Sequence, residues 1–270
     1  MRFHDKAHRF VFLLIIFCLM LGGAGYLYTH YYQSKSPHSQ AASIDEPLHP
    51  NQDSAEAQQI YQDSLKPDYT IPPIVNGLAP VISRLPTKEP VVFLGIDDGA
   101  NKQDFELQTI KDNHVKASLF LANRFIKNNP DFFKGFVSAG SIIENHTINH
   151  KLLSHLSYDE QKAEVCGEAD LQEKQFGRRP ILFRPPGGSY NKDTRRAAAD
   201  CGMKAVVMWI AKANGGSMQY QIGNKLRPGD IVLMHFRPEF QKDMQAFLDA
   251  QKAAGLHTEL LENWLPASKG

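Results

Sequence analysis

The sequence predicts a parallel α/β fold, built either as an open sheet or as a barrel. From Pro90 onward, short apolar runs alternate with helical patterns about seven times. Glycine follows most of the helical patterns, as expected where a helix ends. Periodicity alone does not separate an open sheet from a barrel, and no internal repeat is present.

The first strand is expected at 91–96, a continuous apolar run of the kind found in buried strands. Helical spacing follows at 104–113, and a second apolar run predicts a strand at 117–121. The next helix, at 130–139, has Pro130 at its start and Gly140 at its end. A short strand at 141–143 completes the first half of the alternation.

The longest helix is expected at 157–176, because Ser157 and Glu160 form a capping-box pattern and Gly177 can stop the helix. The same apolar and helical signals predict the remaining elements. These are strands at 181–183, 205–208, 231–234 and 257–260, and helices at 192–201 and 241–254.

The N-terminal segment differs from the rest of the chain. Phe10–Tyr28 is apolar without a charge, which is near the lower limit for a membrane-spanning helix. Arg2, Lys6 and Arg9 precede it, so the positive-inside rule places the N-terminus in the cytoplasm and the bulk of the chain outside. A cleaved signal peptide, followed by secretion, is the alternative. We expect a single-pass protein of the cell membrane.

Three regions follow from these patterns. Residues 1–32 form the cytoplasmic tip and the anchor or signal segment, and residues 33–78 form a flexible linker rich in Ser, Gln, Pro and His. A short helix is expected near 55–65 within that linker. Residues 79–270 carry the strand and helix alternation and form the folded domain, for which we expect a monomer.

Charge and cysteine content narrow the possible partners and the compartment. The formal net charge is +1 and no basic stripe with interleaved aromatics occurs, so we expect no nucleic-acid partner. Cys166 and Cys201 form an even pair in the exported part of the chain. They are expected either to form a disulfide or to remain two separate buried thiols, because sequence does not give their distance.

Carboxylates and imidazoles follow three of the predicted strands. Asp97 and Asp98 are adjacent after the first strand, and their adjacency predicts that they point in different directions from an extended strand end. His146 and His150 have the spacing of one helical turn. His235 follows a later strand. One carboxylate and two imidazoles would hold a zinc-type ion with open positions, leaving an Asp and a His as base and acid.

A stiff loop follows another predicted strand. Arg184 at its start is expected to pair with Asp97 and orient it. Proline and glycine then follow, and a backbone N–H of this loop, near Pro186 and Gly187, could donate to a developing oxyanion. The whole set predicts a metal-dependent hydrolase.

These pieces, in this order, resemble the polysaccharide deacetylase family (carbohydrate esterase family 4, the NodB homology domain). The resemblance covers about 79–264. Its motifs correspond to Gly95-Ile96-Asp97-Asp98-Gly99, to His146 through His150, to Arg184-Pro185-Pro186 with Gly188, and to Leu233-Met234-His235. The family usually has Thr-Phe where this chain has Gly95-Ile96.

The resemblance implies a distorted (β/α) barrel of about seven strands, here preceded by the transmembrane helix and the linker. It implies a divalent metal, usually zinc, with Co²⁺, Ni²⁺ or Fe²⁺ as alternatives. By the resemblance, the metal ligands are Asp98, His146 and His150. The general base is Asp97, the general acid is His235, and Arg184 orients the base. The expected substrate or oxyanion contacts are Gly187, Pro186 and Leu233.

The family removes acetyl groups, mostly from N-acetylated sugars of chitin and peptidoglycan, so we expect a cell-wall glycan as substrate. The chain departs from the family at the fourth motif, where Met208–Gly216 lacks the usual carboxylates, including the one that braces the arginine. Lys212 or Asn214 is expected to occupy part of that space. A catalytically weak glycan-binding homologue, or an O-acetyl esterase or amidase, are the alternative interpretations.

Overall fold

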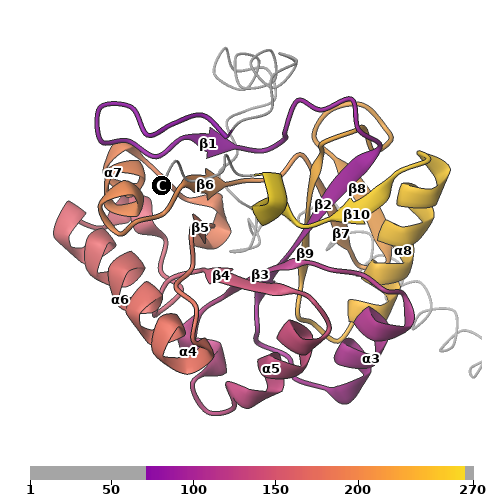
Figure 1. The fold of residues 1–270 in the computed structure, drawn as a ribbon, viewed down its shortest axis with the longest axis horizontal. Helices are drawn as coiled ribbons and strands as arrows, with labels where there is room; N and C mark the ends of the chain where they lie inside the picture. The colour runs from indigo at the N-terminus through magenta and orange to yellow at the C-terminus, as the bar shows by residue number, and fades with distance from the viewer. Residues whose placement is uncertain (1–70, 265–270) are drawn as a thin grey trace, which may run out of the picture. The chain divides into compact units, whose positions relative to one another are not determined.

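A single curled sheet organises the described part of the chain. The computed structural model describes residues 71–264. The strands follow the order β1-β6-β5-β4-β3-β2-β9-β7-β8, and β10 pairs with β2 (Figure 1). They are β1 (Val81–Ile82), β2 (Val91–Asp98), β3 (Ser118–Leu121), β4 (Ile142–Asn145), β5 (Leu182–Phe183), β6 (Ala205–Val207), β7 (Ala211–Asn214), β8 (Ser217–Tyr220), β9 (Ile231–His235) and β10 (His257–Glu259).

Helices surround the curled sheet on its outer side (Figure 1). The longest begins with the predicted capping box of Ser157 and Glu160 and ends at Gly177, which has a left-handed backbone. The helices are α3 (Asp104–Asp112), α4 (Asn123–Ile126), α5 (Asp131–Ser138), α6 (Tyr158–Phe176), α7 (Lys192–Asp200) and α8 (Phe240–Ala253), with 3₁₀ turns η1 (Leu153–His155), η2 (Pro186–Gly188) and η3 (Leu261–Trp264).

Parallel pairing brings the ends of distant strands together. Along this edge Asp97 of β2 lies opposite His235 of β9, and Asp98 lies opposite Leu121 of β3. Leu121 in turn lies opposite Asn145 of β4. The residues that follow β2, β4, β5 and β9 therefore meet at the carboxyl end of the sheet, where α/β folds place their sites.

The predicted alternation of strands and helices is confirmed in its main part. The expected number of about seven strands is too low, because the described sheet has ten, and the sheet is mixed and not purely parallel. It forms a curled half-barrel, with an antiparallel β7–β8 hairpin beyond β9. Gly215 and Gly216 form the hairpin turn with φ of 63° and 76°, values that suit glycine in tight two-residue turns. An isolated antiparallel bridge between Arg84 and Asp230 links the segment after β1 to the start of β9.

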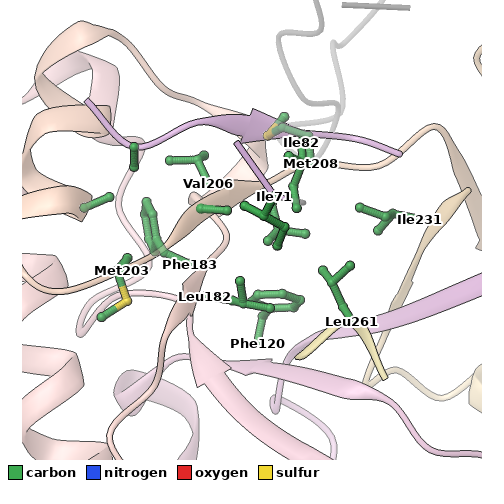
Figure 2. Packing of buried hydrophobic residues seen from close by; sticks show 14 of the residues in the cluster. Ile71, Ile82, Phe120, Leu182, Phe183, Met203, Val206, Met208, Ile231 and Leu261 are labelled. Carbon is green, nitrogen blue, oxygen red and sulfur yellow. The ribbon is translucent and has the colours of Figure 1, made fainter. Parts of the chain in front are cut away.

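Two apolar clusters hold the sheet, and they lie on opposite faces of β2. Alternate side chains of β2 divide between them, because successive residues of a strand point to opposite faces. Val91 and Phe93 join the cluster that includes Phe120, Leu182 and Leu261, and Figure 2 shows side chains of this cluster gathered in the hollow of the curl. The other cluster packs Val92, Leu94 and Ile96 against the helices α3, α5 and α8.

A disulfide joins Cys166 of α6 to Cys201 at the end of α7, with 4.9 Å between the Cα atoms. Of the two alternatives that the sequence left open, the structure therefore has the disulfide and not two separate thiols. Within residues 71–264, none of the helices has the length and apolar character needed to cross a membrane. The expected anchor in 1–32, most of the linker and its short helix lie outside the described residues.

Candidate metal centre

The two aspartates at the end of β2 face the same group, contrary to the expectation that they would diverge. The Asp97 Oδ2 atom lies 3.8 Å from Nε2 of His146, and the Asp98 Oδ1 atom lies 3.4 Å from the same nitrogen. Asp98 has a φ of 77°, so its backbone leaves the extended conformation and the side-chain alternation of the strand ends there. Both carboxylates can therefore act on one site.

The two histidines come together on a turn, so the predicted helical geometry is wrong. Residues 146–150 form neither helix nor strand, and Thr147 and His150 have φ of 71° and 54°. The Thr147 N–H donates to Oδ1 of Asn145 over 3.0 Å, and the His150 N–H donates to Oγ1 of Thr147 over 3.1 Å. Side-chain acceptors thus replace the helical hydrogen bonds and bend the chain sharply.

Asp98, His146 and His150 form a three-ligand group, with one ligand atom from each within 4.8 Å of the others. The His150 Nε2 atom lies 3.0 Å from Oδ1 of Asp98. The His146 Nδ1 atom lies 2.7 Å from the Arg184 carbonyl oxygen, which holds the proton on Nδ1 and leaves Nε2 as a ligand atom. Two imidazole nitrogens and one carboxylate oxygen fit a zinc-type ion with open positions.

The electrostatics of the group suit a cation. Burial raises the pKa of Asp98, but the hydrogen bonds from His146 and His150 outweigh this effect and hold the pKa well below its usual value. Burial lowers the pKa of His146, but Asp97 and Asp98 outweigh it and the net pKa is raised. Without a metal, the two carboxylates therefore stabilise a positive charge on His146, and a bound cation would replace that proton.

Arg184 is fully buried and holds Asp97, as the sequence predicted. Its Nη1 donates to Oδ1 of Asp97 over 2.6 Å, and its Nε donates to the Val207 carbonyl over 3.2 Å. The guanidinium carbon lies 4.1 Å from the centre of the Phe120 ring. A Cβ on Gly95 would lie 2.4 Å from Nη1, so the missing side chain of Gly95 provides the space for the guanidinium.

The segment that replaces the fourth motif gives this arginine little support. The guanidinium carbon lies 5.8 Å from the Trp209 ring, and the buried Nη2 atom has no hydrogen-bond partner in the described structure. Asn214 accepts a hydrogen bond from Arg237 over 3.3 Å, and Lys212 lies in β7 opposite Leu233 of β9. The main-chain oxygen of Val207 and two aromatic rings therefore lie around Arg184, where the resemblance implies a bracing carboxylate.

His235 ends β9 in register with Asp97. Burial lowers the pKa of His235, and the charges of Asp97 and Asp98 oppose this only in part. A lowered pKa makes the protonated imidazole a stronger acid, which suits proton donation to a leaving group. Its role as general acid stays a prediction.

The predicted substrate contacts have different surroundings. Pro186 and Gly187 lie in the tight turn η2, where Gly187 has a φ of 61° and a Cβ on it would lie 2.9 Å from Leu152. Leu233 is only 3% exposed, so little of its side chain is available to a substrate. The oxyanion and groove roles of all three residues stay predictions.

Two contacts near the site were not predicted from the sequence. The Phe125 ring of α4 packs edge-on against the His150 ring, with 5.4 Å between the centres. The Lys102 ammonium donates to the carbonyls of Gly99, Ala100 and Phe125 over 2.9 to 3.1 Å and fixes the chain after Asp98. The four-residue helix α4 is too short for a periodic signal, so no pattern could reveal these contacts.

The profile of the polysaccharide deacetylase family matches residues 84–206. A relative from Streptomyces coelicolor, an uncharacterised protein, is 35% identical over 194 residues, covering 70% of this chain and 78% of the relative. The chain belongs to the polysaccharide deacetylase family. The match contains the aspartate pair, the histidine turn and Arg184, so the three-ligand group lies wholly within the family domain.

Two further similarities bear on activity. A peptidoglycan-N-acetylglucosamine deacetylase of Bacillus cereus is 28% identical over 160 residues, which cover 56% of this chain and 75% of the relative. The crystal structure of a carbohydrate esterase family 4 pseudoenzyme from Bacillus anthracis superimposes with a TM-score of 0.61 at 25% identity and covers 69% of each chain. A mutant described as having restored enzymatic activity matches at 26% identity, with a TM-score of 0.61 and coverage of 69% of this chain and 71% of that one.

Proposed function

We propose that this protein is a metal-dependent hydrolase that removes acetyl groups from the N-acetylated sugars of peptidoglycan. The observation that carries the proposal is the Asp98, His146 and His150 group beside an aspartate that is held by a buried arginine. The fold is that of a deacetylase family, and a peptidoglycan deacetylase is among its relatives.

The residues present fit the roles that hydrolysis of an amide requires. Asp98, His146 and His150 would hold the ion, which supplies Lewis-acid polarisation of the acetyl carbonyl and lowers the pKa of water when bound. Asp97 takes the proton of the attacking water, and Arg184 keeps its carboxylate in place. His235 donates a proton to the amine nitrogen as the carbon–nitrogen bond breaks. The products are acetate and a free amino sugar.

The proposal also includes the identity of the metal and the location of the protein. Zinc is the metal we favour, because two imidazoles and one carboxylate are a common zinc set, and Co²⁺, Ni²⁺ or Fe²⁺ would also suit these ligands. Residues 1–32 anchor the protein in the cell membrane, residues 33–78 form a tether, and residues 79–270 act outside on the wall as a monomer. The apolar run Phe10–Tyr28 and the basic residues before it support this placement.

A second candidate is a glycan-binding protein without useful activity. The family pseudoenzyme of Bacillus anthracis is one of the structural neighbours. Within the described residues, Nη2 of Arg184 also lacks the partner that the family's carboxylate would supply. The retained Asp97, His235 and ligand group favour the enzyme, because a working site needs all of these.

The deciding experiment measures acetate release by the full-length protein in mild detergent, loaded with zinc, from intact peptidoglycan and from N-acetylglucosamine oligomers. An Asp97→Asn variant is the control, since it keeps the size of the side chain and removes the base. We expect release that depends on Asp97. Bound zinc and bound glycan without acetate would favour the binding protein, and release from model acetate esters alone would identify an esterase.

A further inference from the structure

The turn that carries His146 and His150 is held by the neighbouring helix α6. Thr147 and His150 have left-handed backbones, a conformation that is unfavourable for residues other than glycine. Such a conformation persists only where surrounding groups determine it. The acceptors of the backbone N–H groups in this turn therefore decide where the second histidine lies.

Each of the successive N–H groups from Thr147 to His150 has an acceptor. The first donates to Asn145 and the last to Thr147, so both ends of the turn are held locally. The two in the middle donate to one residue of α6. The Ile148 N–H donates to the Glu164 carbonyl over 3.3 Å, and the Asn149 N–H donates to Oε2 of Glu164 over 2.8 Å.

The Glu164 carboxylate binds the turn twice. Its other oxygen, Oε1, accepts from Nδ2 of Asn149 over 2.8 Å and lies 3.4 Å from the Lys151 ammonium. The carboxylate is buried, at 5% exposed. It therefore fixes both the main chain and the side chain of the residue directly before His150. Hydrogen bonds to a charged acceptor are about twice as strong as neutral ones.

Neighbouring residues of α6 complete this contact surface. The Val165 carbonyl accepts from Nδ2 of Asn145 over 2.8 Å. A Cβ on Gly167 would lie 2.5 Å from Cδ1 of Ile148, so the glycine allows the turn to approach the helix. Cys166, between them, carries the disulfide to the end of α7. The part of α6 that holds the turn is thus itself cross-linked.

We propose that Glu164 is a positioning residue for the metal centre: it holds the turn so that His150 faces Asp98 before any ion arrives. The inference rests on the metal site of the proposed function. Loss of this carboxylate leaves two donors of Asn149 without an acceptor, and the histidine must then be ordered by the ion at the expense of binding free energy.

The test measures zinc affinity by competition with a chromogenic chelator, using the full-length protein and the variants Glu164→Ala and Glu164→Gln. We expect a loss of about 10- to 100-fold for Glu164→Ala, the usual range for residues that support metal ligands. Glu164→Gln keeps one acceptor oxygen, so its zinc affinity should lie between that of wild type and that of Glu164→Ala. Glu173→Ala is the matched control, because this exposed glutamate of α6 pairs only with Arg179 in the described contacts, over 2.8 Å.

A second measurement separates positioning from general stability. At saturating zinc, kcat of Glu164→Ala should stay within about twofold of wild type, because the base, the acid and the ligands remain. A Glu164→Ala protein that binds zinc as tightly as wild type would overturn the proposal. The proposal would also fail if Glu164→Gln and the control Glu173→Ala lost zinc affinity to the same extent. If wild type itself binds no zinc, the proposed metal centre fails as well, which is a distinguishable result.

Discussion

Gly95 provides the sharpest test of how Arg184 supports the base. In a Gly95→Ala protein the new methyl group would lie 2.4 Å from Nη1, 2.5 Å from Nη2 and 2.8 Å from Cζ of Arg184. Ordinary contact begins at 3.4 Å, so the guanidinium must move by about 1 Å. The Asp97–Arg184 hydrogen bond of 2.6 Å would then exceed hydrogen-bonding distance if the shift lies along it.

A misplacement of this size in a catalytic group costs about 100-fold in rate, or about 2.7 kcal/mol in the activation free energy. We therefore expect kcat of Gly95→Ala for acetate release to fall by about two orders of magnitude. Zinc affinity should change little, because the three nearest atoms to the new methyl group belong to the Arg184 guanidinium and not to Asp98, His146 or His150.

Gly135→Ala is the matched control, since its methyl group would lie 2.6 Å from the Cδ2 atom of Leu107, the flexible end of a side chain that can rotate away. Thermal unfolding of both variants shows whether the protein still folds. A folded Gly95→Ala protein with wild-type kcat would refute the reasoning, because it would mean that the position of Arg184 is unimportant for the base.

Three further predictions concern stability and the metal. Reduction of Cys166–Cys201, which closes a loop of 35 residues, should lower the free energy of unfolding by about 4 kcal/mol; urea unfolding with and without reductant measures it, and equal midpoints would contradict it. His146→Ala should abolish zinc binding and acetate release together, so an active metal-free variant would refute the ligand assignment. Burial and the neighbouring Glu262 raise the pKa of Glu144 to about 8. The stability that its protonated carboxyl contributes is therefore fully present below the unfolded pKa and is lost by the time the pH has risen through about 8. The unfolding free energy should fall by up to about 1.4 kcal/mol per pH unit between the ordinary glutamate pKa of 4.5 and about 8. Glu262→Gln removes one cause of the raised pKa and should end this fall at a lower pH.

The surroundings of Arg184 are the main question for activity, because this buried arginine holds the proposed base. The chain keeps the ligand group and the Asp97–Arg184 pair but replaces the usual brace with the Val207 carbonyl and aromatic rings. The Val207 carbonyl accepts from Nε and does not supply the full charge of a carboxylate. The buried Nη2 atom has no hydrogen-bond partner among residues 71–264. Acetate release decides whether this weaker support is sufficient.

The sequence predicted the elements whose signals are local. The apolar run of β2, the capping box at Ser157 and the stop at Gly177 depend on neighbours in the chain, and the structure has each of them. The strand β4 shows the limit of such signals, because it was expected to end at Ile143 but continues through two polar residues. One of them, Glu144, is buried and accepts hydrogen bonds from the backbone of Ile181 and Leu182, which a local pattern does not reveal.

By itself, the sequence determined which residue types are available for the site and in what order, and hence the family and the chemistry. Only the tertiary structure decided how they meet. Arg184 and Asp97 are 87 residues apart in the chain, and their contact depends on the space above Gly95. The histidine turn depends on Glu164 of α6. The physical reason is that propensity acts between neighbours in sequence, whereas burial, packing and left-handed backbones are set by groups that only folding brings together.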